Sequence, residues 1–156
     1  MQQKNRNSVA ALALSATALV ALVAHEGYRE SAYIPVPGDR PTIGFGTTGG
    51  VQPGDTIDPV SALQRAIVDV QKFEGAIKRC VTVPLHQHEY DAAVLLSYNI
   101  GGSAFCNSTV VKRFNAGDHE GACEAFLMWN KFLGVTLRGL VVRREKERAL
   151  CLGLQG

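Results

Sequence analysis

The stretch from His25 to Thr48, HEGYRESAYIPVPGDRPTIGFGTT, restricts the fold more than any other part of the sequence. Two short runs of residues that suit strands, 32–36 and 42–45, are joined by Pro37-Gly38-Asp39-Arg40-Pro41. Pro fixes the backbone and Gly permits a tight turn, so this pattern predicts a β-hairpin. We expect a helix that ends near Glu26, then a loop, then the hairpin.

Three side chains in this stretch are candidates for catalysis: Glu26, Asp39 and Thr42. A stiff hairpin would hold Asp39 and Thr42 opposite a helix-borne Glu26, as required by chemistry with an acid on one side of a bond and a base on the other. Singly, each residue has an ordinary explanation, because charges at helix ends are commonly solvated and Asp suits turns. Their combination with the glycine pattern makes the stretch specific.

These residues resemble the active-site signature of the phage-type lysozymes, glycoside hydrolase family 24. The resemblance covers about residues 25 to 153. It implies an α+β, mainly α-helical, lysozyme-like fold, with a small N-terminal β-hairpin lobe and a helical lobe on either side of a cleft. The matching segments are Glu26-Gly27-Tyr28-Arg29, Ala32-Tyr33, Thr42-Ile43-Gly44-Phe45-Gly46-Thr47, Asn99-Ile100-Gly101-Gly102, Phe105, Ser108-Thr109, Asn115-Ala116-Gly117-Asp118, Trp129-Asn130, Gly139-Leu140 and Arg143-Arg144.

The sequence departs from the family pattern at the acidic residue. Family members usually carry Glu, eight residues, Asp or Cys, five residues, then Thr. Counting eight residues on from Glu26 gives Pro35, which cannot serve, and the nearest carboxylate is Asp39, three positions before Thr42. Glu26 and Thr42 are carried over directly, and the role of the Asp is carried to Asp39.

The resemblance implies a phage endolysin that hydrolyses the β-1,4 bond between N-acetylmuramic acid and N-acetylglucosamine in peptidoglycan and so lyses the host cell. Glu26 would protonate the leaving oxygen while Asp39 and Thr42 position and activate water, with inversion at the anomeric carbon. No metal or organic cofactor is needed, and a monomer is expected. Two alternatives stay open: a lytic transglycosylase, which uses one acid and no water, and an inactive membrane-tethered module that binds the cell wall.

Charge argues against a nucleic-acid partner. Residues 1–24 contain Lys4 and Arg6 and no acid, which leaves 14 basic against 14 acidic residues in the remainder. Binding to phosphates needs a concentrated positive excess. One basic cluster remains near the C-terminus, for which we expect a solvated final helix; contact with an anionic wall polymer or with Glu26 is the alternative. Its members are Arg138, Arg143, Arg144, Lys146 and Arg148.

Residues 8–24 form an uncharged, Ala-rich run of 17 residues behind Lys4 and Arg6, the layout of an export signal. As a helix it would span roughly 25 Å, a little short of a ~30 Å hydrocarbon core. It resembles a signal-anchor-release segment, so we expect residues 1–24 to be a weak transmembrane anchor and 25–156 the catalytic domain. The enzyme would reach the periplasm tethered to the inner membrane, with its N-terminus cytoplasmic, and then be released. A cleaved signal peptide or a buried first helix in a cytosolic protein is the alternative.

Helices are predicted beyond the hairpin. Asp58-Pro59 reads as an N-cap and first turn, and apolar residues then recur every three or four positions, at Val60, Leu63, Ile67, Val70, Phe73 and Ile77. Further helices are expected from 87 to 100, ended by Gly101-Gly102, then after caps at Ser108 or Thr109 and at Asp118, and from 140 to 152.

Four cysteines, Cys80, Cys106, Cys123 and Cys151, allow three pairings, and export favours two disulfides. Similarity to lysozymes suggests Cys80 with Cys106 and Cys123 with Cys151. Cys80 with His86 could form a cysteine peptidase or amidase, although the even cysteine count weighs against it. His86 and His88 could ligate a metal but read more simply as exposed residues at a helix start. The His-Glu-x-x-His zinc motif that His25 begins fails, because position 29 is Arg.

Overall fold

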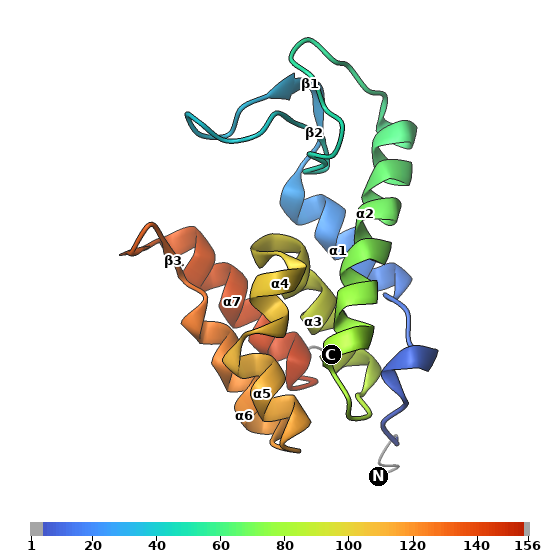
Figure 1. Cartoon of the computed structure of the whole chain (residues 1–156), viewed down its shortest axis with the longest axis vertical. Helices are drawn as coiled ribbons and strands as arrows, with labels where there is room; N and C mark the ends of the chain where they lie inside the picture. The colour runs from blue at the N-terminus through green and yellow to red at the C-terminus, as the bar shows by residue number, and fades with distance from the viewer. Residues whose placement is uncertain (1–4, 155–156) are drawn as a thin grey trace. The chain divides into compact units, whose positions relative to one another are not determined.

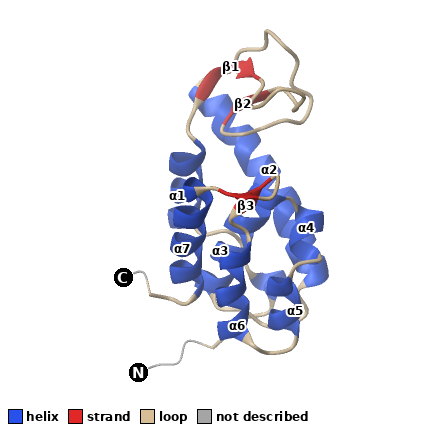
Figure 2. Cartoon of the chain, turned by 90° about the vertical axis from the view of Figure 1, so that its left-hand side faces the viewer, coloured by secondary structure: helices blue, strands red, loops and turns tan. Residues whose placement is uncertain are grey.

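The computed structural model describes residues 5–154 of the 156-residue chain, and Lys4 of the predicted cationic flank lies outside them. The described residues form two compact units, and Figure 1 shows their helices and strands. Residues 16–72 make one unit, and residues 5–15 together with 73–154 make the other. Helices dominate and the strands are short (Figure 2), which confirms the predicted fold class.

In the unit 16–72, helix α1 (Ala16–Glu26) leads into strands β1 (Arg29–Tyr33) and β2 (Thr42–Gly44). α1 ends because Gly27 adopts a φ of +71° and donates its N–H to Val23 O at 3.1 Å, a conformation that glycine tolerates. β1 and β2 are antiparallel, with an irregularity between their two registered pairs. The predicted helix end and hairpin are therefore confirmed.

The first strand lies three residues earlier than its predicted start at residue 32. Pro35 and Pro37 have no N–H to donate, so the pairing stops before them. Residues 55–57 supply further backbone bonds instead, from Ala32 N to Asp55 O and from Ile57 N to Glu30 O, both 2.9 Å. β1 is thus held by more than its hairpin partner.

Helix α2 (Pro59–Cys80) begins as predicted, because Asp58 Oδ1 accepts the N–H groups of Val60 and Ser61, both at 3.0 Å. Its predicted apolar face is wrong in the first turns. Ala62 and Ala66 are buried there, whereas Val60 is 67% exposed. The reason is close packing: a Cβ on Gly44 would lie 2.9 Å from the Cβ of Ala62. Small residues, not large ones, fit where α2 meets β2.

The other unit is built around α3 (Gln87–Ile100), which is buried from Glu89 to Ser97 and packs against α7 (Arg138–Cys151). The short helices between them are α4 (Gly102–Cys106), α5 (Thr109–Asn115), α6 (His119–Glu124) and the 3-10 helix η2 (Ala125–Met128). Ser108 Oγ accepts Val111 N, and Asp118 Oδ1 accepts Gly121 N, so both predicted caps are present. The core side chains of this unit include Tyr90, Val94, Phe105, Phe114 and Phe126.

Both predicted disulfides are present in this unit. Cys80 pairs with Cys106 and Cys123 with Cys151, with Cα–Cα distances of 5.6 and 5.5 Å. They close segments of 26 and 28 residues. The pairing suggested by family resemblance is therefore confirmed.

A second hairpin was not predicted from the sequence. Strands β3 (Lys131–Phe132) and β4 (Val135–Thr136) pair antiparallel around a two-residue turn just before α7. Strands of two residues carry no readable alternation, and the turn residues are Leu-Gly instead of the favoured Asn-Gly. The usual hairpin signal is therefore absent.

The apolar run 8–24 is not one helix in this structure. Val9–Ala11 form a 3-10 turn, η1, and α1 begins only at Ala16. Among the helices formed by residues 5–154, none combines the length and the apolar character needed to cross a membrane.

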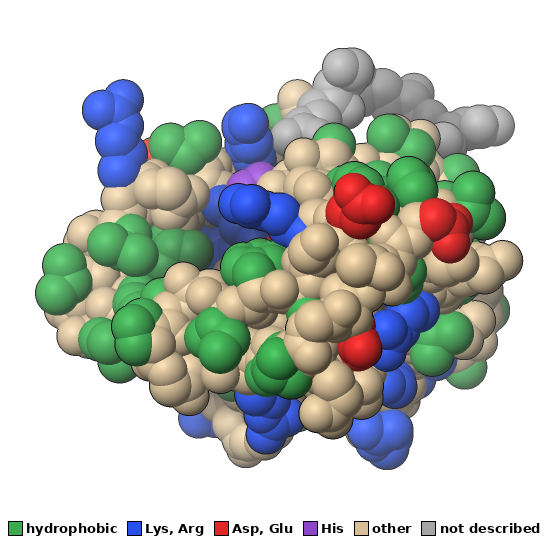
Figure 3. Space-filling view, turned by 90° about the horizontal axis from the view of Figure 1, so that it is seen from above, with side chains coloured by type: hydrophobic (Ala, Val, Ile, Leu, Met, Phe, Trp, Pro, Cys, Tyr) green, Lys and Arg blue, Asp and Glu red, His purple; other side chains and the backbone are tan. Residues whose placement is uncertain are grey.

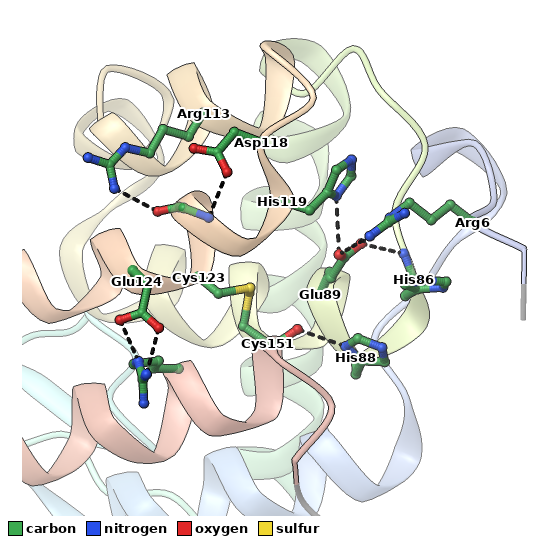
Figure 4. The surroundings of a disulfide bond; sticks show 12 residues. Arg6, His86, His88, Glu89, Arg113, Asp118, His119, Cys123, Glu124 and Cys151 are labelled. Carbon is green, nitrogen blue, oxygen red and sulfur yellow. Dashed lines mark hydrogen bonds and ion pairs between the residues drawn. A yellow bond between two sulfur atoms is a disulfide. The ribbon is translucent and has the colours of Figure 1, made fainter. Parts of the chain in front are cut away.

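Polar bonds fix the segment before α1 to its own unit. Asn7 exchanges backbone bonds with Leu85 at 2.8 and 2.9 Å. Ser15 donates its N–H and its hydroxyl to the two oxygens of the Asp91 carboxylate, at 2.9 and 2.7 Å. Arg6 donates to both oxygens of the buried Glu89 at 3.0 and 3.1 Å (Figure 4).

Candidate active site

Glu26 is the last residue of α1, and its side chain is half-buried. The sequence fixes this position through Gly27, whose left-handed backbone stops the helix and starts the path toward β1. A half-buried carboxyl at the end of a rigid helix can present a proton in a defined direction.

Thr42 is the first residue of β2 and lies opposite Tyr33 in the hairpin register. Its side chain is buried, with 6% exposed, although it is polar. The hydroxyl donates to Arg40 O at 3.2 Å, which fixes the Thr42 rotamer and leaves the hydroxyl oxygen able to accept. A buried and oriented hydroxyl suits the positioning of a small polar molecule such as water.

Asp39 lies in the exposed connection between β1 and β2. Its N–H bonds to Val36 O at 3.0 Å, and its Oδ1 accepts Arg40 N at 2.8 Å, so the side chain also stabilises its own turn. Glu26, Asp39 and Thr42 therefore all lie in the unit 16–72, with Glu26 and Thr42 on ordered elements and Asp39 on the loop. The role of Asp39 as the second carboxylate stays a prediction.

An aromatic pair supports the hairpin from the side of β1. The Tyr28 hydroxyl donates to Ile57 O at 2.5 Å, and the Tyr28 ring lies 5.7 Å from that of Phe45, between ring centroids. Desolvation, together with the carboxylates of Glu30 and Asp58, raises the pKa of Tyr28 above its ordinary value. Tyr28 therefore remains a protonated donor at neutral pH and holds β1 to the segment before α2.

The contact that joins the turn after β2 to α2 was not predicted from the sequence. Thr47 is buried, and its hydroxyl donates to Asp69 Oδ2 at 2.7 Å. Thr47 and Ile43 also exchange both backbone bonds, at 2.9 and 3.0 Å, so the turn directly after Thr42 is fixed. A shallow pocket of about 320 Å³ opens beside this contact. Asp69 gave no signal of its own, because a polar residue on an amphipathic helix is ordinary.

The basic cluster of α7 is only partly solvated, so the expectation of a wholly solvated helix is wrong for two residues. Arg144 is fully buried and Arg143 is 8% exposed. Both guanidiniums lie beside Glu147, at 2.9 and 3.1 Å. Arg144 also donates to Asn99 Oδ1 at 2.9 Å, which joins two of the sequence segments that carried the resemblance. The single buried carboxylate of Glu147 offsets part of the cost of burying these two charges.

Other chemistries find little support in the described part of the chain. Cys80 is bonded to Cys106, so a Cys80–His86 nucleophile pair is excluded in the oxidised protein. His86 and His88 stack with their rings 5.0 Å apart, and His88 Nδ1 lies 2.8 Å from Cys151 O (Figure 4). Residues 5–154 contain no group of three or more His, Cys, Asp or Glu side chains placed to hold a metal ion.

Comparison with known proteins identifies the fold and the family. Residues 23–147 match the phage lysozyme family. The SAR-endolysin of Pseudomonas phage phiKMV is 41% identical over 141 residues, which cover 88% of this chain and 87% of that protein. The endolysin of Escherichia coli O157:H7 phage FAHEc1 superposes with a TM-score of 0.82 at 36% identity, covering 97% and 98% of the two chains.

A muramidase domain has the same fold. The muramidase domain of SpmX from Asticaccaulis excentricus superposes with a TM-score of 0.83 at 30% identity, covering 90% of this chain and 97% of that one. The family match spans Glu26, the β1–β2 hairpin and most of α7. The chain therefore belongs to the phage lysozyme family, a family of glycosidases.

Proposed function

We propose that this protein is an endolysin that hydrolyses the β-1,4 bond between N-acetylmuramic acid and N-acetylglucosamine in peptidoglycan. The observation that carries the proposal is the placement of Glu26 at the end of α1, directly before a hairpin whose second strand begins with the buried Thr42. This placement occurs in a chain whose family match covers both residues. The muramidase title of a structural neighbour supports the same substrate class.

In the proposed mechanism, Glu26 donates its proton to the glycosidic oxygen as the bond to the anomeric carbon breaks. Asp39 accepts a proton from water, and the Thr42 hydroxyl orients that water for attack on the opposite face, which inverts the configuration. The exposed loop position of Asp39 gives its carboxylate access to water. A metal or an organic cofactor is not required by any of these steps.

Product analysis of digested peptidoglycan tests the proposal. The full chain should release new reducing ends. Glu26→Gln should hydrolyse peptidoglycan more slowly by a factor on the order of 10²–10⁴, because the general acid is removed. Glu30→Gln is the matched control, since Glu30 is an exposed glutamate on β1 four residues away, and it should stay active. Unchanged hydrolysis by Glu26→Gln would reject the assignment.

Asp39 separates hydrolysis from the closest alternative. Asp39→Asn should lower the rate strongly if Asp39 activates water. Anhydro ends in the product, together with an active Asp39→Asn variant, would instead indicate a lytic transglycosylase. Binding to peptidoglycan without any cleavage would indicate an inactive wall-binding module.

We further propose that the enzyme is exported to the periplasm, tethered through residues 8–24 to the inner membrane with its N-terminus cytoplasmic, and then released as a monomer. The SAR-endolysin name of the phiKMV relative supports this, as does the uncharged run behind Lys4 and Arg6. The polar bonds of Arg6, Asn7 and Ser15 to the folded chain are those expected of the released form, because these residues could not make them while 8–24 crossed a bilayer.

Val20 allows the tether to be tested without disturbing the released fold. It lies inside the apolar run yet is 65% exposed on α1, so Val20→Lys should leave the folded enzyme intact. The charge should lower membrane insertion, so we expect the variant to be lost from the membrane fraction of expressing cells, whereas Val20→Leu should be retained there. Equal retention of both variants would contradict the tether. Light scattering of the released protein tests the monomer.

A further inference from the structure

The β3–β4 hairpin exposes a cluster of large apolar side chains to solvent. All residues from 131 to 139 are exposed, and Leu133 at the tip is 88% exposed, the highest value among the large hydrophobic residues of the described chain. Four more apolar residues within ten positions are at least 42% exposed: Met128, Phe132, Val135 and Leu137. In Figure 1 the hairpin projects from the start of α7 within its unit. Exposed apolar clusters of this kind mark interaction surfaces.

The backbone of the tip is unfavourable for the residue it carries. Leu133 has a φ of +49° and Gly134 a φ of +80°, and two positive φ values in a two-residue loop define a type I′ turn. The first turn position favours Asn, Asp or Gly, and a bulky side chain is rare there. Leucine at this site therefore carries both backbone strain and exposure to water, which a partner for its side chain would explain.

The charges around the hairpin indicate an anionic partner. No Asp or Glu occurs from residue 125 to residue 144, and Lys131 and Arg138 flank the tip as exposed cations. Figure 3 shows one face of the molecule, on which hydrophobic and basic side chains are exposed together with a few acidic ones. Exposed apolar side chains at the tip can enter an apolar layer, and the cations beside them can bind anionic groups. Both are present at the interface of an anionic lipid bilayer.

We propose that the β3–β4 hairpin inserts into the interface of an anionic phospholipid bilayer. Phe132, Leu133 and Val135 enter the acyl boundary, and Lys131 and Arg138 meet the headgroup phosphates. A glycan strand fits this tip less well, because the side chains of residues 132–135 offer no hydrogen-bonding group. The proposed tether would bring the protein to such a bilayer, so the biological role of this binding rests on the proposed function. The binding of the hairpin to lipid does not depend on that function.

The single tryptophan of the chain provides the probe. Trp129 lies between η2 and β3, is half-buried, and is four residues from Leu133. The full chain is mixed with phosphatidylglycerol vesicles that carry brominated acyl chains, which quench tryptophan on contact. Because the N-terminal apolar run can bind lipid too, sedimentation alone would not identify the hairpin, whereas quenching of Trp129 reports on it directly. We expect quenching with these vesicles and little with phosphatidylcholine.

Leu133→Asn is the decisive variant. It creates Asn-Gly, the favoured type I′ sequence, so the hairpin is kept while the apolar tip is lost. We expect at least a tenfold loss of lipid affinity measured by Trp129 quenching. Val60→Asn is the matched control, since Val60 is an exposed apolar residue of α2, and it should bind lipid like the unmodified chain.

Two results of the quenching experiment would overturn the proposal. The first is no quenching of Trp129 in the unmodified chain, and the second is the same quenching in the Leu133→Asn variant as in the unmodified chain. A variant that keeps its lipid affinity but loses affinity for peptidoglycan, or loses concentration-dependent dimers, would assign the tip to the wall or to a second copy. Hydrolysis of soluble peptidoglycan fragments by Leu133→Asn should be unchanged, so a failed lipid test with intact hydrolysis rejects only this inference.

Discussion

Single residues show where local sequence suffices and where it does not. Gly27 and Asp58 end and begin helices through bonds within four positions, so their roles could be predicted. Arg144 could not be placed, because its burial depends on Glu147 together with Asn99, 45 positions away. Glu26 and Thr42 were identified by resemblance and Asp39 by elimination of Pro35; geometry places the three on one unit without assigning their roles.

A side chain at position 44 should destabilise the fold. Gly44 has a φ of +64°, and an added Cβ would lie 2.9 Å from the Cβ of Ala62 on α2. Gly44→Ala should therefore cost both backbone strain, about 1–3 kcal/mol, and a packing clash of similar size. Urea denaturation of the two variants Gly44→Ala and Gly54→Ala measures the difference.

Gly54 is the matched control, because it has a φ of +91° but nothing within 4 Å of an added Cβ. Gly54→Ala should show the strain alone. Equal destabilisation by the two substitutions would mean that β2 can move away from α2, and the turn after Thr42 would then be less rigid than its bonds to Thr47 indicate.

Helices and strands that are bounded by turn or cap residues could be predicted from the sequence. Those that depend on packing between distant residues could not. The β1–β2 hairpin follows from Pro and Gly in its connection. The buried face of α2 was misjudged, because Ala62 and Ala66 pack where large residues were expected. The β3–β4 hairpin was missed, because two-residue strands and a Leu-Gly turn carry no usual signal.

The attachment of the segment before α1 should depend on pH. Burial raises the pKa of Glu89, but the Arg6 guanidinium, the His86 N–H and His119 outweigh it, so that the pKa of Glu89 lies below its ordinary value. A carboxyl with a lowered pKa in the folded state stabilises the fold above its unfolded pKa, and this contribution is lost as the pH falls through the folded value. Residues 5–15 should therefore detach from Glu89 only in acid, at a pH below the ordinary pKa of a glutamate, about 4.3.

Hydrogen exchange of residues 5–15 as a function of pH measures this detachment. Arg6→Gln removes the bond between residues 5–15 and Glu89 without opening the core, so in that variant exchange should already be raised at neutral pH and should depend less on acid. Glu120→Gln, at an exposed position on α6, should leave the profile unchanged. A pH-independent profile in the unmodified chain would show that the Asn7 and Ser15 bonds hold the segment without Glu89.

For the whole molecule, the two disulfides are the main covalent restraint. Each closes a loop of under 30 residues and should contribute about 3 kcal/mol by restricting the unfolded chain. Cys123→Ser with Cys151→Ser should lower the free energy of unfolding by roughly that amount, measured by urea denaturation. A reduced unmodified chain that unfolds at the same urea concentration as the oxidised one would contradict this expectation.

All four cysteines lie at residue 80 or beyond, and the unit 16–72, which holds Glu26, Asp39 and Thr42, contains none. We therefore expect heat to loosen the β1–β2 hairpin before it unfolds the part of the chain that the disulfides cross-link. Loss of lytic activity would then precede melting of the bulk protein on warming. The lifetime of the activity in storage would be set by the unit 16–72, which has no disulfide. A disulfide added within this unit should therefore extend that lifetime more than a third disulfide added beyond residue 80.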